Sequence, residues 1–327
     1  NSQEINRIKA YYAARNSLDV ALLRIKTFQQ VSQMGLPDGF AQQVDEIWKF
    51  PFAWPLPVLD GMSSMDKDES EEKSKEALFD GVYEQSISDE GSKIDINDLA
   101  SPSKILQETT SLQIINIFNQ YMDTNDEFKD KYQNYNFTEL VNRIADWISS
   151  TNLSKNGGDK RASFSSLGDT YPPNRGFRTL DELRLVPGMN EDFFKLLAPQ
   201  ITIYGSKAIN PNLATARILK SLDKEMTDEA VTKALERRDN PDEGGPFKGK
   251  NSDECRKDFK AFIEGYGVRL SPEFDKIPFT CDKVSTFKII ATGKSGSGKG
   301  AAQKKITAIV MDISGTANKM KSYLEAE

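Results

Sequence analysis

The stretch PPNRGFRTLDELRLVPGMN, residues 172–190, decides the fold of the central part of the chain. Thr179 precedes a run whose first turn carries Asp181 and Glu182, so side-chain oxygen and negative charge lie where a helix N-terminus needs them. We therefore predict a short helix over residues 180–186, ended by the Pro-Gly pair that follows it. Its apolar residues recur at helical spacing and must pack on neighbouring elements: Leu180, Leu183 and Val186. The stretch has no catalytic pattern and indicates a packing unit of an all-helical region.

The composition limits the functions open to the chain. Its 327 residues exceed the usual size of one hydrophobic core, so two domains, or one domain with a large insertion, are expected. A net charge of −6 argues against broad binding to nucleic acid or to an anionic membrane. Histidine is absent, which excludes Ser-His-Asp and Cys-His catalytic sites and histidine-rich zinc sites. We expect no enzymatic activity.

Strand signals flank a helical region. Residues 2–34 contain no Gly or Pro and follow a helical apolar period, so a long amphipathic helix is expected at the start. Residues 81–88 and 93–97 predict a hairpin joined by Asp89, Glu90 and Gly91. Strands return over 286–292 and 306–312, before a charged tail. Between them, helices are expected over residues 104–122, 137–148, 180–186, 191–197, 213–222, 228–237 and 254–264.

Two segments near the first helix have their own character. Residues 48–61, WKFPFAWPLPVLDG, predict an extended segment anchored on a core by Phe50, Phe52 and Trp54. Residues 63–76 are acidic and serine-rich without an apolar period, and predict a solvated loop.

The fold class that follows is α+β. We expect a long N-terminal helix with an antiparallel sheet, and a large all-helical domain inserted between the strands. The predicted domains are residues 1–100 and 282–327, which together form the helix-and-sheet part, and residues 101–281, which form the insertion.

Residues 293–299, GKSGSGK, fit the G-x-x-x-x-G-K pattern of a nucleotide-binding P-loop. A P-loop needs Ser or Thr next to hold magnesium, and it opens a helix, but Gly300 stands in that position. A strand signal follows within a few residues. We therefore favour a lysine-bearing loop between two antiparallel strands over a nucleotide hydrolase.

Residues 183–189, LRLVPGM, are similar to a helix-hairpin-helix, which binds the DNA backbone through hairpin amides. The second hairpin glycine is missing, since Asn190 occupies the turn exit. Nearby carboxylates would repel phosphate: Asp181, Glu182, Glu191 and Asp192. A nucleic-acid-binding module is the alternative function, and it is disfavoured.

The two cysteines, Cys255 and Cys281, are either one disulfide or two unrelated buried thiols. Oxygen-rich loops, one of them containing Asp159 and Asp169, are either calcium-binding loops or ordinary polar loops, and neither has EF-hand spacing.

Several segments, in order along the chain, resemble the large minor pseudopilins of type II secretion, the general secretion protein K group. NRGFRTLDELRLVPGM (174–189), after the helix ending in ADWI (145–148), carries the strongest resemblance. The other matching segments are NRIKAYYAARNSLDVALLRI (6–25), FPFAWPLP (50–57), GVYEQSISDEGSKIDINDLA (81–100) and AINPNLATARILKSL (208–222). The resemblance implies a pilin-like helix and sheet interrupted by a helical domain.

The resemblance also implies a function and a location. The protein would be a structural subunit at the tip of the periplasmic pseudopilus, associating with other minor pseudopilins to initiate or cap assembly for protein export. Its N-terminal helix would bind them through Ile5, Ile8, Tyr12, Leu18 and Leu22, with core packing the safer role for Leu18 and Leu22. A hydrophobic helix before residue 1, absent from this chain, would sit in the bacterial inner membrane, with this portion in the periplasm.

Two site expectations follow from the same resemblance. Family members bind calcium in the helical domain, which makes Asp159 and Asp169 candidate ligands. A periplasmic setting favours a disulfide between Cys255 and Cys281.

Overall fold

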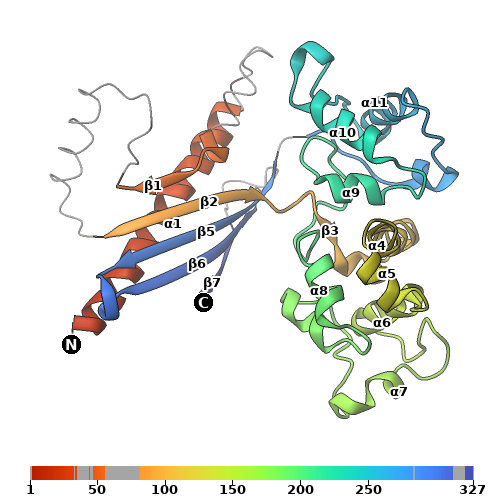
Figure 1. Ribbon diagram of the computed structural model, residues 1–327, viewed down its shortest axis with the longest axis horizontal. Helices are drawn as coiled ribbons and strands as arrows, with labels where there is room; N and C mark the ends of the chain where they lie inside the picture. The colour runs from red at the N-terminus through yellow and green to blue at the C-terminus, as the bar shows by residue number, and fades with distance from the viewer. Residues whose placement is uncertain are drawn as a thin grey trace. The chain divides into compact units, whose positions relative to one another are not determined.

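The computed structural model describes residues 2–32, 34, 44, 47–55, 81–282, 284–311 and 321–326. The chain forms two compact units, one from residues 1–89 with 285–327 and one from residues 90–284. In Figure 1 the first unit contains the long helix and the sheet, and the second contains the short helices. The acidic run over residues 63–76 lies outside the described residues.

The first unit is built on α1 (Ser2–Ser32). Its buried face consists mostly of small side chains: Ala10, Ala13, Ala14, Ser17, Leu18, Ala21, Ile25 and Phe28. At Gly293 a Cβ atom would lie 2.1 Å from the Ala10 carbonyl oxygen and 2.3 Å from the Ala14 nitrogen. The helix therefore rests directly on the backbone of the sheet.

The sheet has the order β1-β2-β5-β6-β7, and every neighbouring pair is antiparallel. Helix α1 packs on β2, β5 and β6. These elements, together with the helical unit, confirm the α+β fold class. The strands are β1 (Phe52–Trp54), β2 (Val82–Asp89), β5 (Thr286–Ser295), β6 (Ala302–Met311) and β7 (Lys321–Ala326). The strand β7 occupies part of the segment that was expected to be a charged tail.

The helical unit is inserted between two paired strands. Asp89, at the end of β2, lies opposite Phe287, at the start of β5, so the chain leaves and re-enters the sheet at neighbouring positions (Figure 1). The first boundary lies at residues 89 and 90, whereas the sequence placed it at 100 and 101. The difference arises because Ile94, Ile96 and Leu99 are buried in the core of the helical unit.

The hairpin predicted over residues 81–97 does not form. Strand β2 pairs with β1 and β5, while β3 (Ile94–Asp95) pairs in parallel with β4 (Ile201–Thr202). The Thr202 hydroxyl also donates to the Glu90 carboxylate at 2.9 Å. Burial of Ile94 and Ile96 among distant residues outweighs the local turn signal.

Strands β5 and β6 form an antiparallel hairpin, as predicted for residues 293–299. Its connection contains the 3-10 turn η7 (Gly298–Gly300), and Gly296 and Gly298 have left-handed φ angles of 79° and 59°. A P-loop leads into a helix, but this segment leads into β6. The topology excludes the nucleotide-site hypothesis.

Trp48, at 4% exposure, anchors the proline-rich segment after α1. Its ring packs edge-on against Phe28 and Phe287, with centroids 6.2 and 5.4 Å away. Phe50, predicted to be an anchor, is 54% exposed, whereas Phe52 stacks on Tyr83. Residues 52–54 are extended as predicted, residues 56–61 lie outside the described residues, and Trp48 takes the anchoring role expected of Phe50.

The helical unit contains short helices and 3-10 turns around one core. The elements are η2 (Ile96–Ala100), α4 (Lys104–Thr124), α5 (Asp126–Tyr132), α6 (Phe137–Ile148), α7 (Arg161–Phe164), η3 (Ser165–Leu167), η4 (Leu180–Leu185), α8 (Glu191–Leu197), α9 (Ala216–Ser221), α10 (Asp228–Arg238), η5 (Pro241–Glu243), α11 (Ser252–Glu264) and η6 (Pro272–Lys276). Helix α9 begins after residue 213 because the Thr215 side chain caps it, accepting from the Ile218 amide.

The stretch 172–190 packs into the middle of this unit. Phe177 stacks on Trp147 with ring centroids 5.4 Å apart, and Leu183 and Val186 are buried. Residues 180–185 form a 3-10 helix, η4, and the Thr179 side chain makes no capping bond, contrary to prediction. Glu182 instead accepts from the Arg178 amide and pairs with Arg175.

Candidate partner-binding site

Helix α1 presents apolar side chains on the face turned away from the sheet. Ile5, Ile8 and Tyr12 are 54%, 58% and 58% exposed. At about 100° per residue, Ile8 lies about 180° around the helix from Ser17, whose hydroxyl donates to the Glu84 carbonyl oxygen of β2 at 3.1 Å. One face of α1 therefore binds the sheet, and the opposite face is free of it.

A fourth residue, Tyr11, belongs to the same surface and was not among the predicted site residues. It is 45% exposed, and its ring packs edge-on against Tyr12 with centroids 5.6 Å apart. The adjacent tyrosines at the start of the helix were the available sequence signal. We call Ile5, Ile8, Tyr11 and Tyr12 the α1 patch.

The α1 patch ends at residue 12. Further along the same face, Arg15 lies 3.8 Å from Asp19, and Gln30 is exposed. Charged and polar side chains at these positions are solvated, as on an ordinary helix surface. Leu23, at 64% exposure, is an isolated apolar side chain further along the helix. The first turns of α1 therefore carry the densest exposed apolar surface of the helix.

Leu18 and Leu22, also predicted to bind partners, are less exposed than the α1 patch. Leu18 is 2% exposed and belongs to the core, and Leu22 is half-buried. The structure thus leaves three of the five predicted residues exposed for a partner.

The start of α1 is fastened to the β5–β6 turn. The Asn6 side-chain amide donates to the Gly300 carbonyl oxygen at 2.9 Å. A Cβ atom at Gly296 would lie 2.4 Å from Asn6 Nδ2, so glycine is needed there for this approach. These contacts hold the α1 patch in a fixed orientation on the unit, which lowers the entropy lost on binding.

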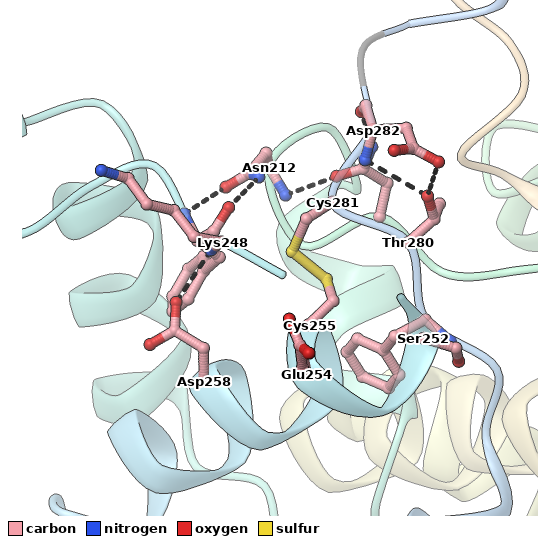
Figure 2. The surroundings of a disulfide bond; sticks show 12 residues. Asn212, Lys248, Ser252, Glu254, Cys255, Asp258, Thr280, Cys281 and Asp282 are labelled. Atoms are coloured by element: carbon pink, nitrogen blue, oxygen red, sulfur yellow. Dashed lines mark hydrogen bonds between the residues drawn. A yellow bond between two sulfur atoms is a disulfide. The ribbon is translucent and has the colours of Figure 1, made fainter. Parts of the chain in front are cut away.

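Cys255 and Cys281 form a disulfide, with Cα atoms 5.7 Å apart (Figure 2). Cys255 is on α11, and Cys281 lies just before the end of the helical unit. The Asn210 side chain donates to the Asp282 carbonyl oxygen at 2.7 Å, and Thr280 donates to the Asp282 carboxylate. The last segment of the insertion is therefore bound to its own core by a covalent bond and hydrogen bonds.

The predicted calcium ligands, Asp159 and Asp169, are both on the surface of the helical unit. Asp159 is exposed and accepts from the Arg161 amide and guanidinium at 2.9 and 3.2 Å, which holds the pKa of its carboxyl below the usual range. Asp169 is exposed as well. Across the described ranges, no group of three or more His, Cys, Asp and Glu side chains could hold a metal ion. Calcium binding by Asp159 and Asp169 stays a prediction.

The loop between Ser149 and Lys160 is instead organised by hydrogen bonds. Buried Asp146 accepts from the Ser154 hydroxyl and the Lys155 amide. The buried Lys160 ammonium donates to the Asp146 and Ser149 carbonyl oxygens at 3.1 and 2.5 Å, at the C-terminus of α6. Burial lowers the pKa of Lys160, and the carbonyl oxygens and helix dipole favour its charge.

The hairpin at residues 186–190 is poorly suited to binding a phosphate of the DNA backbone. The Asn190 side chain accepts from the Phe193 amide, which uses a donor that a phosphate would need. Arg184 is neutralised by Asp181 and Glu191. The Tyr135 hydroxyl donates to the Gly188 carbonyl oxygen, so side chains of the same unit cover the turn.

Part of the helical unit matches a known protein family. Residues 92–206 match the family model described as type II secretion system (T2SS), protein K. The matched residues lie within the helical unit. This segment includes the stretch 172–190, and the match confirms the resemblance seen in the sequence.

Curated sequences and solved structures give two further comparisons. No curated protein matches the chain by sequence. Among solved structures, a chain of "The Crystal Structure of the GspK-GspI-GspJ complex from enterotoxigenic Escherichia coli Type 2 Secretion System" matches with a TM-score of 0.54 and 14% identity, over 76% of this chain and 80% of that chain. The chain therefore shares the fold of that protein. Of the helices in the described part, none is long and apolar enough to cross a membrane.

Proposed function

We propose that this chain is a non-enzymatic subunit of the type II secretion pseudopilus tip, which associates with other minor pseudopilins through the α1 patch. The protein K match over residues 92–206 and the shared fold support a minor pseudopilin role. The similar solved chain was crystallised in a GspK-GspI-GspJ complex, which supports partners of that kind. The large unit inserted into the sheet adds bulk suited to a subunit that initiates or caps assembly.

The observation that carries the proposal is the exposure of the α1 patch. These apolar side chains are more than 40% exposed at successive turns of one helix. Burying them against a partner would stabilise the complex by about 25 cal/mol for each Å² of apolar surface removed from water. A partner helix laid along residues 5–12 would cover them at i, i+3 and i+7 spacing. The patch faces away from the sheet, so binding requires no rearrangement of the core.

The same proposal places this portion in the periplasm, anchored to the bacterial inner membrane by a segment preceding residue 1. The disulfide supports an oxidising compartment, because such bonds persist there.

The test is co-purification with the two smaller minor pseudopilins of the same secretion system. We expect one complex of all three proteins on size exclusion, and its loss in the double variant Ile8→Asp/Tyr12→Asp. The charge would be buried unpaired at the interface, whereas both side chains are exposed in the free protein.

The control is Gln30→Asp, which places one such negative charge on the same helix face beyond the α1 patch. This variant should retain the complex. An intact complex in the double variant would contradict the role of the patch, and no complex with the native chain would contradict the proposed function.

A further inference from the structure

A hollow of about 480 Å³ opens on the helical unit between α4, α5, α8 and α9. Its volume is in the usual range for binding sites of small ligands and peptide side chains. A second hollow, of about 280 Å³, shares Tyr121 and Arg217 with it and continues along α4 towards α10. Neither hollow includes the α1 patch.

Aromatic rings form the apolar part of the larger hollow. Phe128 packs on Tyr121 and Tyr132, with ring centroids 4.9 and 4.7 Å away. The Phe128 side chain is buried, whereas both tyrosines are half-buried and line the hollow. Such rings give an apolar surface with little conformational freedom to lose on binding.

The rim carries positive charge that is only partly neutralised. Asp192 accepts from the Lys131 ammonium at 2.5 Å and the Tyr132 hydroxyl at 2.6 Å, so its charge is already satisfied. Lys195 lies 3.7 Å from Glu191, at the outer limit of an ion pair. Glu127 also lines the hollow, so the lining has three cations and two carboxylates, and Glu191 lies just outside it beside Lys195.

Arg217 is the cation of the hollow that is most available to a ligand. Its guanidinium lies 5.1 Å from the centroid of the Tyr121 ring, and within the described part of the chain it forms no ion pair. A guanidinium presents N–H groups in its own plane, and these match the two oxygens of a carboxylate.

We propose that this hollow binds an acidic peptide segment of a partner protein, in which an apolar side chain lies beside a carboxylate. The apolar side chain packs on Tyr121 and Tyr132, and the carboxylate pairs with Arg217, supported by Lys195. Charge complementarity selects this occupant, because Arg217 forms no ion pair with any described residue and a carboxylate of the peptide would supply one. This inference concerns the helical unit and does not depend on the α1 patch or on pseudopilus assembly.

The probes are two fluorescein-labelled, end-blocked peptides, the acidic GDFEG and the neutral GNFQG, whose binding to the full chain is followed by fluorescence polarisation. The acidic peptide should bind at least tenfold more tightly, and raising the salt concentration should weaken its binding because exposed charges are screened. Arg217→Gln should reduce the affinity about tenfold, and Lys195→Gln severalfold. Glu127→Gln, which removes a like charge, should increase the affinity severalfold.

The control is Lys257→Gln on α11, an exposed lysine that does not line the hollow. It should bind the acidic peptide as the native chain does, and matching melting temperatures show that the variants are folded. Equal binding of the two peptides, no detectable binding of the acidic peptide, or unchanged binding by both Arg217→Gln and Glu127→Gln would overturn the proposal.

Discussion

Gly293 sets the distance between α1 and the sheet. The helix backbone lies so close that any side chain at this position would overlap the Ala10 and Ala14 backbone atoms. In the sequence, Gly293 stands out only as the first residue of the G-x-x-x-x-G-K pattern. Its role is to permit close packing, which no sequence pattern of its own strand indicates.

Gly293→Ala should therefore destabilise the helix-and-sheet unit by about 3 kcal/mol, because the helix must move outward. Urea denaturation followed by circular dichroism would measure the change. The control is Gly300→Ala in the same hairpin, where a Cβ atom would meet its nearest neighbour at 3.7 Å. Similar losses in the two variants would contradict the close-packing argument.

Glu182 makes the stretch 172–190 sensitive to acid. It pairs with Arg175 in two hydrogen bonds of 3.1 and 2.8 Å, and this contact lowers the pKa of the Glu182 carboxyl below 4.5. Since the native pKa is below the unfolded value, the contribution is complete above pH 4.5 and is lost as the pH falls through the native pKa.

We expect Glu182→Gln to lower the free energy of unfolding by about 1 kcal/mol at pH 7 and to make it less dependent on pH below 4.5. Melting curves between pH 3 and pH 7 would test this. The exposed Glu229, changed to Gln, serves as the control and should leave the profile unchanged. A Glu182→Gln profile parallel to the native one would refute the prediction.

At the scale of elements, the disulfide connects α11 to the last segment of the helical unit. The cysteines are 26 residues apart, and closing such a loop stabilises a fold by about 3 to 4 kcal/mol on the chain-entropy estimate. Chemical reduction, or the double variant Cys255→Ser/Cys281→Ser, should lower the stability of the helical unit by about that amount.

The measurement is denaturation with and without reductant. In the double variant, reductant should have no further effect, which is the internal control. A native chain whose unfolding midpoint is the same in both conditions would show that the bridge contributes nothing.

On the scale of the whole molecule, the helical unit has a complete core of its own. Its cluster of buried residues runs from Ile94 to Phe279 and includes no residue of α1 or the large sheet. Residues 90–284 should therefore fold as a separate protein with a single cooperative thermal transition, seen by circular dichroism.

The fragment 101–281 provides the comparison. It lacks Ile94, Ile96 and Leu99 and the pairing of β3 with β4, so it should melt at a lower temperature or fail to fold. Equal stability of the two fragments would show that the β3 region is dispensable and that the domain boundary lies nearer residue 101.

The sequence by itself determined the long first helix, most of the helices between residues 104 and 264, and the insertion of a helical domain into an α+β fold. These features follow from the spacing of apolar residues and from capping residues, which act within a few positions along the chain. Ile5, Ile8 and Tyr12 are exposed, as a partner-binding role requires, but that role came from the family resemblance and stays a prediction.

Only the tertiary structure decided which strands pair, that Leu18 packs in the core, and that Arg217 stands over Tyr121 beside a hollow. It also decided that β3 belongs to the helical unit and that Asp159 pairs with Arg161. Each of these depends on the three-dimensional neighbourhood of a residue, including contacts between positions tens to hundreds of residues apart. Local patterns do not encode those contacts, because burial and pairing energies from distant segments outweigh the preferences of a short stretch.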